Sequence, residues 1–204
     1  APPKSNSSVW HGLIIVYIVG AIYGLIYRGI LTFFPAYLSE RVSFISEHVG
    51  KLGIVSSMIM GIAVVGPFLG GYLASTRKAV ERNLFFVFGS LAILSLGFYF
   101  LEELPLIIAL VPAVLLIFSF QPLQNALIAS ISLPRHRGRA YGINFTLSFG
   151  VGAVASGLGG LVKEKFGLSS VFLLMLGLCI AELIVMAIGK ATSRGGVRDG
   201  LSQL

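Results

Sequence analysis

Two stretches of the chain, Gly53–Gly71 (GIVSSMIMGIAVVGPFLGG) and Gly142–Gly160 (GINFTLSFGVGAVASGLGG), are related by a shift of 89 positions. Seven positions of this alignment are identical, and in the first copy they are Gly53, Ile54, Gly61, Val65, Leu69, Gly70 and Gly71. Both stretches are apolar, and each is long enough to cross a bilayer as a helix. If three crossings separate equivalent points, the two copies run in opposite directions. Inverted repeats of this kind are typical of transporters.

The composition of the chain is that of a membrane protein. Charged residues make up 11% of the 204 residues and hydrophobic residues 56%, with a mean hydropathy of +0.92. A soluble domain carries about 25% charged residues. The apolar runs are continuous rather than alternating, which argues against a β-barrel. The net charge of +7 comes from short loops between these runs, so it indicates topology rather than a nucleic-acid partner.

Six apolar runs are long enough to span a hydrocarbon core of about 30 Å. They cover roughly residues 11–38, 48–74, 84–101, 105–130, 139–162 and 168–189. The repeated stretches fall in the second and the fifth of these runs. Residues 1–10 are polar and contain proline, as linkers often do. Because the chain also begins at Ala1, we expect it to be a piece of a longer protein.

The Lys and Arg residues outside the runs divide unevenly between the two sides of the membrane. One side carries ten of them, namely Lys4, Arg77, Lys78, Arg82, Arg135, Arg137, Arg139, Lys190, Arg194 and Arg198. The other side carries four, namely Arg41, Lys51, Lys163 and Lys165. Because cytoplasmic loops are rich in Lys and Arg, this bias predicts that both termini are cytoplasmic in the plasma (inner) membrane. The second run then goes inward and the fifth outward, so the repeat is antiparallel.

Glycines on the repeated runs predict close helix packing, because small residues let the backbones of membrane helices approach each other. The packing candidates are Gly66, Gly70, Gly138, Gly142, Gly150 and Gly159. Both a tight static contact and a sliding interface fit this pattern. Pro67, Pro112 and Pro122 lie inside runs, where they predict kinks.

Segments that flank these runs resemble the signatures of the major facilitator superfamily of secondary transporters. The segment from Gly71 to Lys78 is similar to the family's loop signature of Gly, three residues, an acid and basic residues, although Ser75 replaces the acid. Gly160 to Gly167 fits the same pattern with its acid present, and Arg135 to Gly142 resembles the start of the family's eleventh helix. The residues that carry these motifs are candidates for gating: Gly71, Ser75, Arg77, Lys78, Arg135, Arg137, Gly160, Glu164 and Lys165.

The resemblance covers nearly the whole chain and implies an all-α polytopic membrane protein, the C-terminal six-helix half of such a transporter. Residues 1–10 would end a cytoplasmic linker, 11–190 would form the half, and 191–204 would be a cytoplasmic tail. Inverted three-helix repeats would cover about residues 11–101 and 105–189. The implied function is secondary transport of a small solute, such as an organic anion or a drug-like compound, by alternating access. The implied partners are lipid, the solute, and the N-terminal half or a second copy; no cofactor or metal is expected.

Arg28 is the first candidate for a substrate contact. It lies within roughly 5 Å of the bilayer midplane, where an arginine facing lipid is costly. Since the first helix of each half lines the family's central cavity, the resemblance implies that Arg28 holds an anionic group. The alternatives are a structural arginine bonded to helix carbonyls and an arginine that snorkels outward. The other candidates for substrate binding are Tyr23, Tyr27, Gln121, Gln124, Asn125 and Asn144. For the four amides, hydrogen bonds between helices are the alternative.

Glu182 is the one acid inside a run, and it is a candidate for proton coupling or for packing on a peripheral helix. An intramembrane enzyme is disfavoured, because His11, His48 and His136 lie in loops or at run ends and Asp199 is the only Asp. The Asn-Pro-Ala motifs of six-helix water channels are missing from the sequence. The remaining alternative is a self-contained six-helix protein that acts as a homodimer or as a scaffold without transport.

Overall fold

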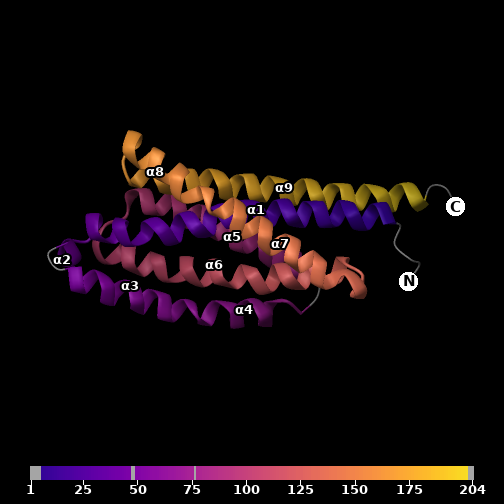
Figure 1. The fold of residues 1–204 in the computed structure, drawn as a ribbon, viewed down its shortest axis with the longest axis horizontal. Helices are drawn as coiled ribbons and strands as arrows, with labels where there is room; N and C mark the ends of the chain where they lie inside the picture. Colours follow the sequence, from indigo (N-terminus) through magenta and orange to yellow (C-terminus); the bar gives the residue numbers. More distant parts are fainter. Residues whose placement is uncertain (1–5, 47–48, 76, 202–204) are drawn as a thin grey trace.

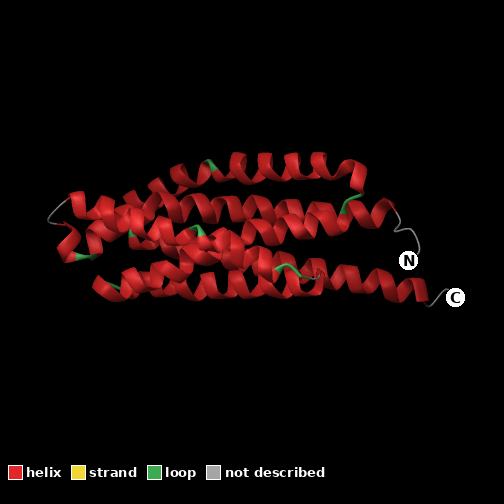
Figure 2. Ribbon diagram, turned by 90° about the horizontal axis from the view of Figure 1, so that it is seen from below, coloured by secondary structure: helices red, strands yellow, loops and turns green. Residues whose placement is uncertain are grey.

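The computed structural model describes residues 6–46, 49–75 and 77–201, and its regular structure over these residues is helical throughout (Figures 1 and 2). The elements are α1 (Asn6–Arg41), α2 (Ser43–Ser46), α3 (Val49–Ala63), α4 (Val65–Leu73), α5 (Arg77–Phe100), α6 (Glu103–Ile131), the 3₁₀ turn η1 (Pro134–His136), α7 (Arg137–Gly152), α8 (Val154–Phe166) and α9 (Ser169–Leu201). Among the described residues, six stretches are long and apolar enough to cross a membrane: Trp10–Arg41, Gly50–Leu73, Lys78–Phe100, Glu103–Ile131, Pro134–Phe166 and Ser169–Lys190. The six predicted spans are confirmed.

The helices extend beyond the apolar runs at several ends. The third run was expected from residue 84, yet α5 begins at Arg77, and α8 continues to Phe166 beyond the expected end at 162. α1 begins at Asn6 and α9 continues to Leu201, so parts of the expected linker and tail are helical. Hydropathy misses such ends because a polar residue can continue a helix outside the hydrocarbon. Lys4 and the side chains of Arg77, Arg194 and Arg198 lie outside what the structure describes.

Both copies of the repeat contain a break in their helix. α3 stops at Ala63 and α4 resumes at Val65, while α7 stops at Gly152 and α8 resumes at Val154. The residues between them, 64 and 153, are separated by the same 89 positions that relate the two copies in sequence. In the first copy Pro67 lacks an N–H and crowds the carbonyl of Ala63, which explains the break there. Pro112 and Pro122 do not break α6.

The two halves of the sequence interlock rather than forming separate bundles. α4 of the first half packs against α6 of the second, and α7 of the second packs against α1 of the first. α5 also packs on α6, and α9 packs on both α1 and α5. Figure 1 shows α7 and α8 crossing α1 at an angle. This exchange of partners is what two inverted three-helix units produce when each completes the other.

One end of the bundle is held together by polar contacts. The Arg41 guanidinium forms an ion pair with Glu102 and donates to Ser169 Oγ at 2.6 Å. The Ser43 N–H donates to the Glu103 carboxylate. Glu103 lies in the tight turn between α5 and α6, where its backbone has φ 51°. These contacts join the end of α1 to the α5–α6 turn and to the start of α9.

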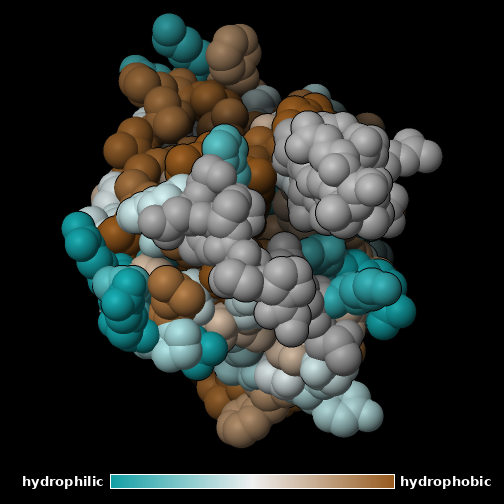
Figure 3. Space-filling model, turned by 90° about the vertical axis from the view of Figure 1, so that its right-hand side faces the viewer, coloured by the Kyte–Doolittle hydropathy of each residue, from teal (hydrophilic) through white to brown (hydrophobic). Residues whose placement is uncertain are grey.

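The opposite end of the bundle carries the beginning of α1 and the end of α9 (Figure 1). Lys78, Arg82, Arg135, Arg137 and Arg139 are exposed and belong to the segments that the charge bias assigned to one side. Figure 3 looks at this end, where hydrophilic side chains gather around the rim and apolar side chains cover the flank. The described helices therefore cross the bundle an even number of times, as expected.

Candidate functional site

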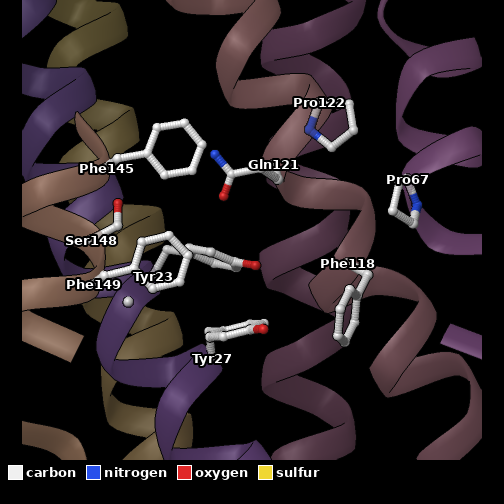
Figure 4. A pocket seen from close by; sticks show the side chains of 10 residues that line it. Tyr23, Tyr27, Pro67, Phe118, Gln121, Pro122, Phe145, Ser148 and Phe149 are labelled. Atoms are coloured by element: carbon white, nitrogen blue, oxygen red, sulfur yellow. The ribbon is translucent and has the colours of Figure 1, made fainter. Parts of the chain in front are cut away.

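Four helices surround a pocket of about 260 Å³. α1 contributes Tyr23, Gly24 and Tyr27, α4 contributes Pro67, α6 contributes Phe118, Gln121 and Pro122, and α7 contributes Phe145, Ser148 and Phe149. We refer to this space as the α1–α4–α6–α7 pocket (Figure 4). Because Tyr27 is the neighbour of Arg28, the pocket lies near the middle of the first span.

Aromatic rings form most of the pocket wall. The Tyr27 ring meets the Phe118 ring with centroids 5.7 Å apart and the Phe149 ring with centroids 6.3 Å apart, both edge to face. Phe145 and Phe149 lie one turn apart on α7 with their rings nearly parallel. Phe149 is 56% exposed and Phe145 is 40% exposed, so this wall faces outward from the chain.

The pocket has few polar groups, and they differ in their hydrogen bonding. The Tyr23 hydroxyl donates to the Ile117 carbonyl at 2.9 Å, so it holds α1 against α6. Gln121 Nε2 and Ser148 Oγ are buried and have no hydrogen-bond partner. Figure 4 shows the Gln121 amide reaching into the space between Phe145 and Tyr23. A buried donor without a partner costs about 1–3 kcal/mol, which makes Gln121 a candidate for contact with a ligand.

Gln124 and Asn144 are paired with each other. Gln124 Nε2 donates to Asn144 Oδ1 at 3.0 Å, and Asn144 Nδ2 donates to Gln124 Oε1 at 3.1 Å. Gln124 Nε2 also donates to the Val16 carbonyl at 3.1 Å, and both side chains are fully buried. This amide pair therefore joins α1, α6 and α7, which is the interhelical alternative for these residues.

The structure does not bring Arg28 or Asn125 to the pocket wall. Arg28 follows Tyr27 by one residue, so its side chain leaves α1 about 100° around the helix from Tyr27 and about 40° from Gly24. Thr32, one turn further on, contacts Ser156 of α8 at 3.3 Å, and Arg28 itself is exposed. Arg28 is therefore not part of this pocket wall, and its role beside a bound anion stays a prediction. Asn125 Oδ1 is buried without a partner elsewhere on α6.

Glu182 lies inside the bundle, away from the pocket. Its side chain is 0% exposed, and neither carboxyl oxygen has a hydrogen-bond partner. Ser95 on α5 is also fully buried, and its Oγ has no partner. Cys179 is buried one turn away on α9. Ionised Glu182 would be very costly in these surroundings, so this conformation fits a protonated carboxyl.

The candidate gating residues lie at both ends of the bundle. Gly71 lies within α4, and Gly160, Glu164 and Lys165 lie within α8, so these residues belong to the last turns of helices rather than to loops. Ser75, Lys78, Arg135 and Arg137 are exposed around the other helix ends, and the side chain of Arg77 is outside the described part. The two copies of the signature therefore end on opposite sides of the bundle (Figure 1).

The packing glycines fall into two groups. Gly66 and Gly70 lie against α6, where a Cβ on Gly70 would overlap the Ser119 carbonyl oxygen, and Gly159 lies against the Phe33 ring. Three others have no heavy atom within 4 Å of the place where a Cβ would be: Gly138, Gly142 and Gly150. Their expected close packing does not occur within this chain, because they lie on open faces of α7. The reason is geometric, since Asn144 and Ser148 occupy the face turned to α1.

A scan against protein families matches the Major Facilitator Superfamily over residues 2–156. The match covers well over half of the chain. The chain belongs to the major facilitator superfamily. The family consists of secondary transporters rather than enzymes, which confirms the expected class. Among curated proteins no match to this chain is found.

Among the residues that line the pocket, Tyr23, Tyr27 and Gln121 were predicted from the sequence, and most of the pocket wall was not. Phe145 and Phe149 could have been found, because they are spaced by one helical turn on a run that the resemblance assigns to the cavity. Phe118 and Ser148 carried no such signal. Whether Phe118 and Ser148 line the pocket depends on how α4, α6 and α7 pack together.

Proposed function

We propose that the chain is the C-terminal half of a secondary transporter that moves a small solute across the plasma (inner) membrane by alternating access. The observation that carries this proposal is the α1–α4–α6–α7 pocket, which is lined by four helices and includes the exposed side chains Phe145 and Phe149 of α7. A pocket of about 260 Å³ is below the 300–1,000 Å³ typical of small-molecule sites. A second body facing it would complete such a site.

Two helices have open faces that suit a partner. In the most apolar part of the second span 17% of the residues are buried, and in that of the fifth span 22% are. The corresponding shares are 50% in the first span and 44% in the fourth. On α7 the residues Gly138, Gly142, Phe145 and Phe149 follow the spacing of one helical face. The open space at both glycines leaves room for another helix to approach closely. The N-terminal half of the same transporter is the proposed partner, and the termini are proposed to be cytoplasmic.

Glu182 is the proposed coupling group. Its buried carboxyl without a partner fits a group that carries a proton in this conformation and loses it when the α5–α9 packing changes. The charged signature residues at the helix ends, among them Lys78, Arg135 and Glu164, are proposed to contact the partner half during gating.

Uptake assays on proteoliposomes test the division into halves. The full-length protein and residues 1–204 alone would be reconstituted and tested with the same panel of radiolabelled solutes. We expect uptake by the full-length protein and none by the isolated chain, because half of the site is missing. Uptake by the isolated chain would instead support the alternative of a homodimer. No uptake by either protein, for any solute of a broad panel, would favour a scaffold.

A further inference from the structure

The α1–α4–α6–α7 pocket has no formal charge on its wall. Its lining residues include no carboxylate, ammonium, guanidinium or imidazole. Arg28, the nearest charge in the sequence of α1, is exposed and is not among the lining residues. A charged ligand group would lose its hydration here without gaining an ion pair, which is unfavourable at this depth in the membrane. The wall therefore selects against ions.

Aromatic side chains line the pocket from three helices. Phe145 and Phe149 stand on α7 and Phe118 stands across from them on α6, while the Tyr27 ring of α1 lies between Phe149 and Phe118 and meets both edge to face. We refer to the space beside the Tyr27 ring, between Phe145 and Phe118, as the slot (Figure 4). Aromatic rings favour offset-stacked or edge-to-face contacts with other rings. A flat ring system is the shape that such walls contact over the largest area.

Gln121 supplies a directional group in this slot. Its Nε2 is buried without a partner, whereas the Tyr23 hydroxyl is already committed to the Ile117 carbonyl. A site with an unsatisfied donor discriminates strongly against ligands that cannot accept a hydrogen bond. The ligand group beside Gln121 should thus carry an acceptor, such as a carbonyl oxygen.

We propose that this half-site binds an uncharged, flat aromatic group of one or two fused rings that bears a hydrogen-bond acceptor turned to Gln121. The inference rests on the proposed function and replaces the organic anion that Arg28 suggested. The pocket volume of about 260 Å³ limits the group to part of a typical drug-sized ligand. The remainder of the substrate would contact the other half.

Binding of matched naphthalene probes to the full-length protein in nanodiscs tests the inference. The probes are 2-naphthamide, which is uncharged with an acceptor, 2-naphthoate, 2-naphthyl-trimethylammonium and 2-methylnaphthalene. Affinity would be measured by titration calorimetry and ring contact by saturation-transfer NMR. We expect 2-naphthamide to bind most tightly. Gln121→Leu should weaken it about tenfold, which corresponds to about 1.4 kcal/mol, with little effect on 2-methylnaphthalene.

Three variants separate the pocket from nonspecific partitioning and from the anion site. Phe149→Ala should abolish the signal, while Phe86→Ala, on an exposed α5 residue, and Arg28→Gln should leave it unchanged.

Tighter binding of 2-naphthoate that is lost in Arg28→Gln would overturn the inference in favour of an anion. Tighter binding of the trimethylammonium probe, by the cation–π attraction of the rings, would overturn it in favour of a cation. If the anionic or the cationic probe binds more tightly and its binding still requires Phe149, the proposed function of the pocket as half of a substrate site would remain supported. Binding of no probe, or binding indifferent to Phe149, would overturn the inference itself.

Discussion

At the scale of single residues, the polar groups inside this half divide into those that are satisfied and those that are open. Gln124 and Asn144 satisfy each other across α6 and α7, whereas Gln121, Asn125 and Ser148 keep a buried polar atom without a partner. The resemblance to the family placed all the amides on cavity-facing runs, but the sequence could not distinguish these roles. Amides one turn apart on a helix look alike until the neighbouring helix is in place, because the hydrogen-bond partners come from residues distant in the sequence.

The amide pair is expected to contribute to stability. Gln124→Leu and Asn144→Leu should each lower the thermal stability of the full-length protein. The first leaves the buried Asn144 amide without its partner, and the second leaves the buried Gln124 Oε1 without its donor. The double variant should be more stable than the sum of the two losses implies, with a coupling of about 0.5–2 kcal/mol, as for hydrogen bonds between membrane helices. The measurement is a thermal-melting double-mutant cycle in detergent. Strictly additive losses would show that the two side chains do not interact.

Glu182 is expected to govern the pH dependence of transport. If it carries the coupled proton, Glu182→Gln should still exchange solute across the membrane but should no longer accumulate it against a gradient in response to a pH step. The matched control is Glu40→Gln, which alters an exposed carboxylate at the end of α1. The readout is uptake into proteoliposomes with and without an imposed pH difference. Pumping by Glu182→Gln that equals wild type would remove Glu182 from the coupling mechanism.

At the scale of the helices, the repeat read from the sequence has a physical counterpart. The two helix breaks, at residues 64 and 153, keep the 89-position offset, and so do the paired glycines that end each copy. The spans were predictable because a bilayer requires about 20 apolar residues for each crossing. The helix ends beyond the membrane were not, because no apolar pattern marks them. The glycine pattern was ambiguous for a similar reason, since a small residue is equally compatible with a packed face and an open one.

Adjacent glycines in each copy give matched tests of this packing. Gly70 lies against the Ser119 backbone, while at Gly71 a Cβ would meet open space; Gly159 lies against Phe33, while Gly160 is open. Gly70→Ala should destabilise the protein by about 1–3 kcal/mol, the usual range for overpacking, and Gly71→Ala should have little effect. Gly159→Ala should cost less than Gly70→Ala, since a side chain can move more easily than a backbone carbonyl. Thermal melting provides the measurement, and equal losses at Gly70 and Gly71 would contradict the packing of α4 on α6.

At the scale of the whole molecule, the interlocked repeats make this chain a single body. α4 and α7 each pack on the first helix of the opposite repeat, and the ion pair of Arg41 and Glu102 joins α1 to the α5–α6 turn. A body of this kind can rock as a unit against a partner, which is how alternating access works in transporters with inverted repeats. The account therefore requires that water reach the α1–α4–α6–α7 pocket from each side of the membrane in turn.

The most direct test of this requirement is the accessibility of a cysteine placed in the pocket of the full-length protein. Phe149→Cys would be built with Cys179 and any other cysteine replaced by serine, reconstituted in oriented proteoliposomes, and treated with a membrane-impermeant maleimide from either side. Ile93→Cys is the control, because this exposed residue lies near the middle of the third apolar run, where a lipid-facing thiol stays unlabelled. We predict labelling of Phe149→Cys from both sides and none at Ile93→Cys. If the maleimide fails to label Phe149→Cys from one side of the membrane or from both, alternating access to the pocket would be contradicted.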